Sequence, residues 1–112
     1  MNLFKQAMDY SIRVAELVKF LREDHKGFPL GDALLACGVE AGLNLREPDA
    51  EGKRRTAEAL EKVDYLIEMA VAAGYLTERQ SVPIREEGRA LLDAIGVNKK
   101  KTSFEEMRRN KQ

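Results

Sequence analysis

The 112-residue sequence has few of the residue types on which enzymes and metal centres rely. Its single cysteine, Cys37, excludes an intrachain disulfide and is typical of a reducing compartment. Its single histidine, His25, argues against a histidine-based metal site within one chain. Tryptophan is absent and no glycine-rich phosphate loop occurs. We therefore expect no catalytic residue, no metal and no cofactor, and the sequence predicts a protein that is not an enzyme.

Long apolar runs and an excess of one charge are also missing. No apolar stretch approaches the about 20 residues of a membrane span, and the first residues, MNLFKQAMDYSIR, lack the pattern of a signal peptide. We expect a cytoplasmic protein without a membrane partner. The 19 basic and 19 acidic residues cancel, which excludes a uniformly basic nucleic-acid module and an acidic disordered chain.

The zero net charge hides an uneven distribution. Residues 99–112 hold six basic and two acidic residues and carry +4, whereas residues 1–98 carry −4. We predict a folded domain over residues 1–98 and a basic, flexible tail over 99–112. The tail is either a solvated terminus or a contact for nucleic acid or an acidic partner. Its candidate nucleic-acid-binding residues are Lys99, Lys100, Lys101, Arg108 and Arg109.

Apolar residues recur at three- to four-residue steps in four segments, which predicts four helices. The first is expected over Leu3–Asp24 and the second over Leu30–Glu47. The third follows a cap at Asp49 and runs to Ala73, with Gly74 as its left-handed end. After a capping box of Thr77 and Gln80, the main fourth helix is expected from Pro83 to Ile95 and is closed by Gly96. Short connections favour an all-α, up-and-down antiparallel four-helix bundle.

The second predicted helix is apolar on nearly all sides. Such a helix is expected to be central and packed on more than one side. Its small residues, among them Gly38 and Gly42, allow a neighbouring helix to approach closely. The first helix also has a wide apolar stripe, whose two rows include Phe4, Met8, Ala15 and Val18. The apolar surface exceeds what one small bundle consumes, so we expect a homo-oligomer.

Individual reactive groups give weak signals. Cys37 lies in an apolar helix, and we expect no nearby cation, which predicts a buried, inert thiol. His25 lies in a polar loop and is expected to be exposed. Asp64 and Glu68 are one helical turn apart and could bind a cation, form a structural hydrogen bond or be exposed.

A basic cluster stands at the start of the third predicted helix. It consists of Lys53, Arg54 and Arg55, and Arg46 precedes it by one loop. One interpretation is salt bridging with Glu47, Asp49 and Glu51. The other is a phosphate-contacting patch, which a ring of identical subunits would repeat around its axis. These four basic residues are therefore candidate nucleic-acid contacts.

Three stretches carry a family resemblance over roughly residues 4–95. Residues 60–76, LEKVDYLIEMAVAAGYL, match a third helix that ends in a Gly-Tyr-Leu turn. Residues 42–47, GLNLRE, match a Pro-Ser-Asn-Ile-Ala-Glu motif at Asn44 and Glu47, and DYSIRVAELVKFL fits the opening helix. In these stretches the chain resembles the bacterial four-helix-bundle family of ribosomal RNA intervening-sequence proteins. That family is related to the accessory variability determinant of diversity-generating retroelements.

The resemblance implies a non-enzymatic bundle that assembles into a homopentamer. For the retroelement members it also implies binding of RNA or DNA and of a reverse transcriptase. The chain departs from the motif at Gly42, Leu43 and Pro48, and Pro83 is unusual in the last helix. Relatives that bind nucleic acid are typically basic, whereas this chain is neutral. The alternative function is therefore a structural protein–protein interaction module without a nucleic-acid role.

Overall fold

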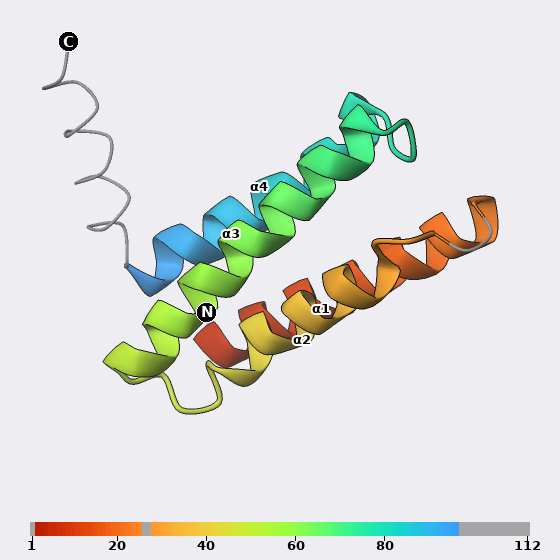
Figure 1. Cartoon of the computed structure of the whole chain (residues 1–112). Coiled ribbons are helices and arrows are strands. Elements are labelled where there is room, and N and C mark those ends of the chain that lie inside the picture. The colour runs from red at the N-terminus through yellow and green to blue at the C-terminus, as the bar shows by residue number, and fades with distance from the viewer. Residues whose placement is uncertain (1, 26–27, 97–112) are drawn as a thin grey trace, which may run out of the picture.

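The computed structural model describes residues 2–25 and 28–96, which form four helices and no strand. The helices are α1 (Leu3–Asp24), α2 (Gly31–Leu43), α3 (Ala50–Ala72) and α4 (Glu78–Ile95). Each helix packs against the next one, and α4 returns to α1, so that the four helices enclose one core (Figure 1). The predicted all-α four-helix bundle is confirmed. The predicted basic tail, with Lys99, Lys100, Lys101, Arg108 and Arg109, lies outside the described residues.

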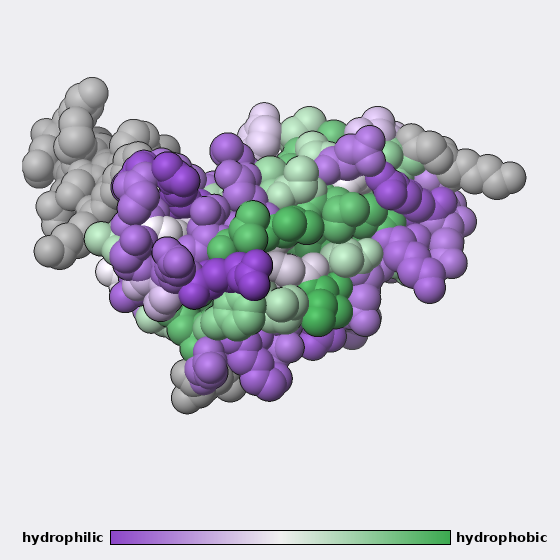
Figure 2. All heavy atoms as spheres, turned by 90° about the horizontal axis from the view of Figure 1, so that it is seen from below, coloured by the Kyte–Doolittle hydropathy of each residue, from purple (hydrophilic) through white to green (hydrophobic). Residues whose placement is uncertain are grey.

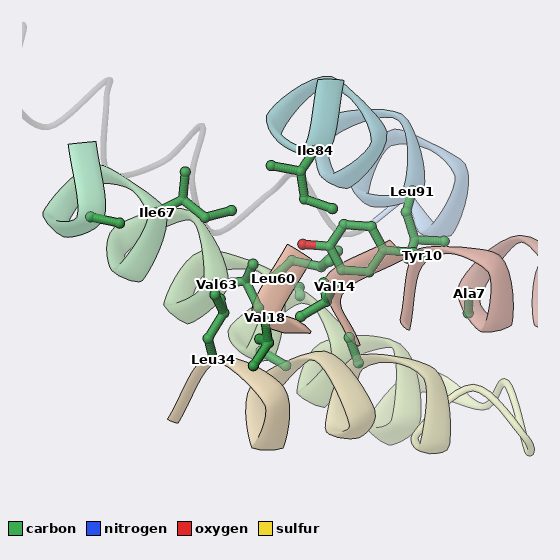
Figure 3. Packing of buried hydrophobic residues seen from close by; sticks show 14 of the residues in the cluster. Ala7, Tyr10, Val14, Val18, Leu34, Leu60, Val63, Ile67, Ile84 and Leu91 are labelled. Carbon is green, nitrogen blue, oxygen red and sulfur yellow. The ribbon is translucent and has the colours of Figure 1, made fainter. Parts of the chain in front are cut away.

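The core is aliphatic apart from Tyr10 and Phe28 (Figure 3). Helix α1 buries the side of the helix that carries Ala7, Tyr10, Val14, Val18 and Leu21. The sequence pattern had also placed Met8 and Ala15 toward the core, but both are exposed. Tyr10, which is only 3% exposed, was not among the expected core residues. Its spacing of three residues from Ala7 and four from Val14 is the helical signal that marks it.

Helices α1 and α2 approach each other where α2 has glycine. A Cβ atom added to Gly38 would lie 2.6 Å from Cγ1 of Val14, so no larger residue fits without a shift. The hydroxyl of Ser11 donates a 2.6 Å hydrogen bond to the carbonyl oxygen of Gly38, and Gly42 faces the same serine. The predicted close approach of a neighbouring helix is confirmed.

Helix α2 differs from the prediction in its end and in its surroundings. It ends at Leu43 rather than Glu47, because the Asn44 side chain donates to the Glu40 carbonyl and Pro48 disfavours helical backbone at the residue before it. Leu45, just past the helix, is fully buried and closes the bundle at this end. The helix packs against two neighbours, α1 and α3, as predicted, but it is not central, since its outward side keeps Val39 and Leu43 about half exposed.

The predicted helix caps are confirmed. Asp49 caps α3 by accepting a 2.7 Å hydrogen bond from the backbone N–H of Gly52. Thr77 and Gln80 form the capping box of α4, and Gly96 ends that helix in the left-handed conformation. Gly74 likewise has positive φ after α3. Each cap satisfies backbone groups that a helix end leaves without partners.

Helix α4 starts at Glu78 rather than at Pro83, so the proline lies inside the helix. Proline cannot donate the hydrogen bond that would reach the carbonyl four residues earlier, that of Arg79. Both Pro83 and Arg79 are exposed, so water can satisfy that carbonyl. The capping box, together with burial of Ser81 and Ile84, keeps the first turns helical.

We predict that Gly38→Ala destabilises the fold although alanine has the higher helix propensity. The gain in propensity is about 1 kcal/mol, whereas overpacking against Val14 costs about 1–3 kcal/mol. Gly31→Ala is the matched control on the same helix, because its added Cβ meets only the end of the flexible Arg22 side chain. Urea unfolding should show a loss for Gly38→Ala and little change for Gly31→Ala. Equal stability of the two variants would contradict the close contact.

Candidate functional site

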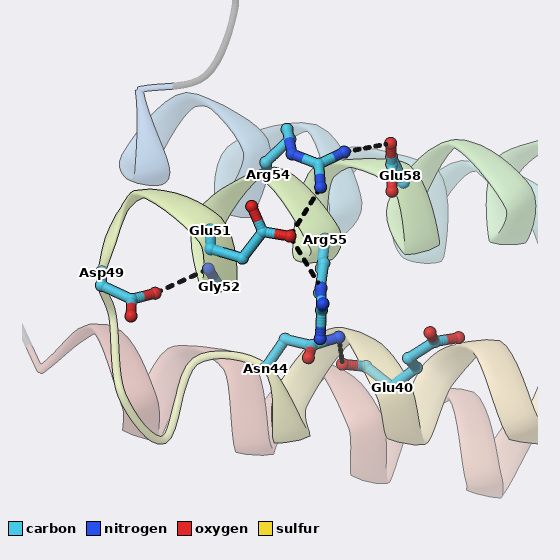
Figure 4. Close-up of polar contacts among 8 residues, drawn as sticks. All are labelled: Glu40, Asn44, Asp49, Glu51, Gly52, Arg54, Arg55 and Glu58. Carbon is cyan, nitrogen blue, oxygen red and sulfur yellow. Dashed lines mark hydrogen bonds and ion pairs between the residues drawn. The ribbon is translucent and has the colours of Figure 1, made fainter.

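The four candidate basic residues of the described chain gather around the α2–α3 connection. Arg46 lies in that connection, and Lys53, Arg54 and Arg55 lie in the first turns of α3. Figure 4 shows Arg54 and Arg55 with their acidic neighbours. The chain turns back between the helices, and the Asp49 cap sets the direction in which α3 leaves the turn. The structure therefore brings the predicted cluster together.

Acidic residues neutralise the two arginines at the centre of this cluster. Arg54 donates to Oε1 of Glu51 at 2.6 Å and to Oε2 of Glu58 at 2.9 Å. Arg55 donates to the same Glu51 oxygen at 3.0 Å. The predicted pairing with Glu51 is confirmed, whereas Asp49 serves as the helix cap and Glu58 was not foreseen. The four-residue spacing of Arg54 and Glu58 is the signal that identifies this second partner.

These contacts perturb the protonation of the groups involved. Hydrogen bonds from Arg54, its charge and a hydrogen bond from Arg55 hold the pKa of Glu51 below its usual range. The hydrogen bond and charge of Glu51 in turn raise the pKa of Arg54. All three side chains are exposed, so salt and water weaken the effect on stability. Glu51 and Glu58 hold the two arginine side chains in place and balance their charge.

Arg46 and Lys53 differ from the two central arginines. Neither side chain forms an ion pair with another of the described residues. Arg46 is exposed and lines a shallow hollow at the α2–α3 connection together with Arg55, Glu47, Asp49 and Glu51. The hollow therefore presents both signs of charge. It suits a polar or zwitterionic surface better than a bare polyanion.

The other candidate groups have structural partners. His25 is half-buried rather than exposed, and its Nε2 lies 3.1 Å from the carbonyl oxygen of Tyr75, whose ring it meets edge-on. Asp64 accepts from Nε of Arg85 at 3.0 Å, so it joins α3 to α4. Cys37 is partly buried and burial raises the pKa of its thiol, although Lys62 lies near enough to oppose that rise. The expectation of no nearby cation was wrong, because Lys62 comes from α3.

No group of three His, Cys, Asp or Glu side chains in the described part of the chain is arranged to hold a metal ion. None of the helices that the structure describes is long and apolar enough to cross a membrane.

A second surface, the α1–α2 apolar face, consists of Met8, Ile12, Val39 and Leu43. Their side chains are 44–55% exposed. Ser11 faces Gly38, and in an antiparallel pair the next residues, Ile12 and Val39, project from the same side. Met8 and Leu43 lie one turn further along the two helices. Figure 2 shows the molecule from the side of α1 and α2, where hydrophobic residues form a band between charged ones.

Comparison with known proteins supports the fold. The chain resembles the crystal structure of a protein of unknown function from the S23 ribosomal protein family of Bacteroides thetaiotaomicron VPI-5482. The TM-score is 0.77 and the sequence identity is 19%, and the match covers 84% of this chain and 94% of that one. No protein-family model matches the chain, and no curated protein matches it significantly. At this identity the likeness shows a shared all-helical fold.

We predict that the pKa of Glu51 depends on both arginines. Its carboxyl should titrate below the usual range of glutamate, and Arg54→Gln should return the pKa most of the way because Arg54 is the largest cause of the shift. Because the folded-state pKa is lowered, the associated stabilisation is present above the unfolded pKa and disappears as the pH falls through the folded value. Carbon NMR of the carboxyl measures this titration. A titration that Arg54→Gln leaves unchanged would show that the ion pairs do not form in solution.

Proposed function

We propose that the chain is a non-enzymatic scaffold protein that self-associates through the α1–α2 apolar face. The observation that supports this most directly is the group of four large apolar side chains exposed side by side on two helices. Complete burial of one such side chain is worth about 1.5–3 kcal/mol. A contiguous patch of this kind on a small protein is typical of an interaction surface.

The chemistry of the site favours a second copy of the chain as the partner. The described residues contain no cluster for metal catalysis, and His25, Asp64 and the central arginines are held by structural contacts. The resemblance of the sequence to the intervening-sequence family implies a ring of five copies. In a ring, one surface of each copy meets a different surface of the next. Tyr65 and Met69, which are exposed one turn apart on α3, supply a second apolar surface.

We predict that the protein is an oligomer at micromolar concentration and that Val39→Glu dissociates it. A carboxylate placed in an apolar contact should weaken association by about tenfold or more. In a ring Met69→Glu should have the same effect, whereas in a twofold dimer only Val39→Glu should act. Val82→Glu, which alters an exposed apolar residue on α4, is the matched control. Sedimentation velocity distinguishes these cases, and a monomeric wild-type protein would refute the proposal.

A second candidate function is association with RNA. It is favoured by Arg46 and Lys53, which have no acidic partner among the described residues, and by the name of the structural neighbour's family, which refers to a ribosomal protein. A role beside a reverse transcriptase, as the retroelement relatives imply, belongs to this candidate. Equal numbers of acidic and basic side chains around the α2–α3 connection limit the affinity that one subunit can reach. Repetition of the patch in an oligomer would raise it.

If RNA binding occurs, Arg46→Gln and Lys53→Gln should weaken it more than Arg54→Gln and Arg55→Gln do. The first two cations are available to phosphates, whereas the latter two are already paired with Glu51 and Glu58. Each lost phosphate contact should also reduce the salt dependence by about 0.7 in the logarithmic slope for a single strand. Fluorescence anisotropy with single-stranded RNA at several salt concentrations measures both quantities. If no RNA binds at low salt, this candidate function is refuted and the alternative, a structural protein–protein interaction module without a nucleic-acid role, is favoured.

A further inference from the structure

Between α1, α3 and α4 lies a partly open pocket of about 130 Å³, which we call the Tyr10 pocket. It is lined by Tyr10 of α1, by Leu60, Val63 and Asp64 of α3, and by Ile84 and Gly88 of α4. A cavity of similar volume in a protein core, roughly 150 Å³ and lined by apolar side chains, accepts a benzene molecule. The Tyr10 pocket is therefore large enough for a small ring.

The pocket has one polar group that lacks a protein partner. Tyr10 is 3% exposed, and its hydroxyl forms no hydrogen bond with the residues that the structure describes. Every fully enclosed side-chain polar atom in the described part of the chain has a hydrogen-bond partner. Because the Tyr10 hydroxyl has none, it is not fully enclosed and opens into the pocket. In Figure 3 it points into the space between Ile84 and Leu60. A polar group in this position takes its partner from water or from a molecule that enters the pocket.

Gly88 keeps the space beside the hydroxyl open. A Cβ atom on this residue would lie 3.3 Å from the hydroxyl oxygen of Tyr10 and 3.4 Å from its ring. Glycine inside a helix costs about 1 kcal/mol relative to alanine, and Gly88 has an ordinary negative φ. The backbone of α4 therefore does not require glycine here, whereas a Cβ atom at this position would crowd the Tyr10 side chain and narrow the pocket.

The charges around the pocket favour an uncharged ligand. Asp64 and Arg85 are bound to each other through two hydrogen bonds of 3.0 and 3.4 Å. Glu61 and Arg89, which are exposed and of opposite sign, stand at the entrance. Burial raises the pKa of Tyr10, and the negative charges of Asp64 and Glu87 raise it further. The hydroxyl is therefore protonated at neutral pH and donates a hydrogen bond.

We propose that the Tyr10 pocket binds a small uncharged molecule that has an apolar ring and one hydrogen-bond acceptor. The ring occupies the opening beside the Tyr10 hydroxyl and Gly88, where the nearly fully buried Leu60, Val63 and Ile84 form the floor. The acceptor receives the hydrogen bond of Tyr10. This site is independent of the α1–α2 apolar face and of the basic cluster, so it does not rest on the function proposed above.

The test is an NMR titration of the full chain with benzyl alcohol, toluene and benzoate. Benzyl alcohol should bind in the millimolar range with saturable shifts around Tyr10 and Gly88. Toluene lacks the acceptor and should bind about three- to tenfold more weakly. Benzoate carries a charge that the paired Asp64 and Arg85 cannot compensate, so it should bind most weakly.

Two variants separate recognition from simple burial. Tyr10→Phe keeps the ring and removes the donor, so it should abolish the preference for benzyl alcohol over toluene. Gly88→Ala narrows the pocket and should weaken both ligands, while Tyr75→Phe, which removes a tyrosine hydroxyl outside the pocket, is the matched control and should change neither. Thermal melting shows that the variants fold. The proposal is overturned if no shift saturates, if the shifts map to Val39 and Ile12, or if wild-type protein binds benzyl alcohol and toluene equally.

Discussion

The close contact between α1 and α2 at Gly38 determines much of the remaining structure. With Val14 against the glycine and the Ser11 hydroxyl on its carbonyl oxygen, the two helices approach until their backbones nearly touch. Small residues therefore form the contact between these two helices. The large apolar residues of α2 lie elsewhere on the helix, and only Leu34 among them is fully buried. The glycines of α2 face α1, so the two helices pack closely on that side. The same arrangement leaves large apolar residues of α2 on its exposed outer side.

The remaining helices pack differently because their contacts are made by larger side chains. Thr56 anchors α3 to α2 through a 2.9 Å hydrogen bond to the Ala41 carbonyl, and Asp64 joins α3 to α4 through Arg85. These polar links hold α3 in register with both neighbours, while the Tyr10 ring is part of the core and lines the pocket that faces α3 and α4.

The sequence predicted features that depend on local chemistry. The caps at Asp49 and Thr77, the glycine ends and the four helical segments follow from residues close together in the chain, and all of them are observed. The predicted end of α2 and the predicted start of α4 were wrong, because burial acts there together with the local signals of Asn44, Pro48 and the Thr77–Gln80 capping box. Burial of Leu45 draws the chain out of the helix, and burial of Ser81 and Ile84 extends α4 ahead of Pro83. Local helix propensity contributes less free energy than such burial.

The candidate sites also differ in how far apart their residues lie in the sequence. The basic cluster was visible in the sequence, and so was its pairing with Glu51, because these residues lie within one or two turns of a helix. The Tyr10 pocket was not visible, because it needs residues from α1, α3 and α4 that are up to 82 positions apart. No spacing rule relates Tyr10 to Gly88. The remaining signal was Gly88 itself, a glycine inside a helix. Such a residue lowers helix stability, so the side chains that pack beside it are expected to explain its presence.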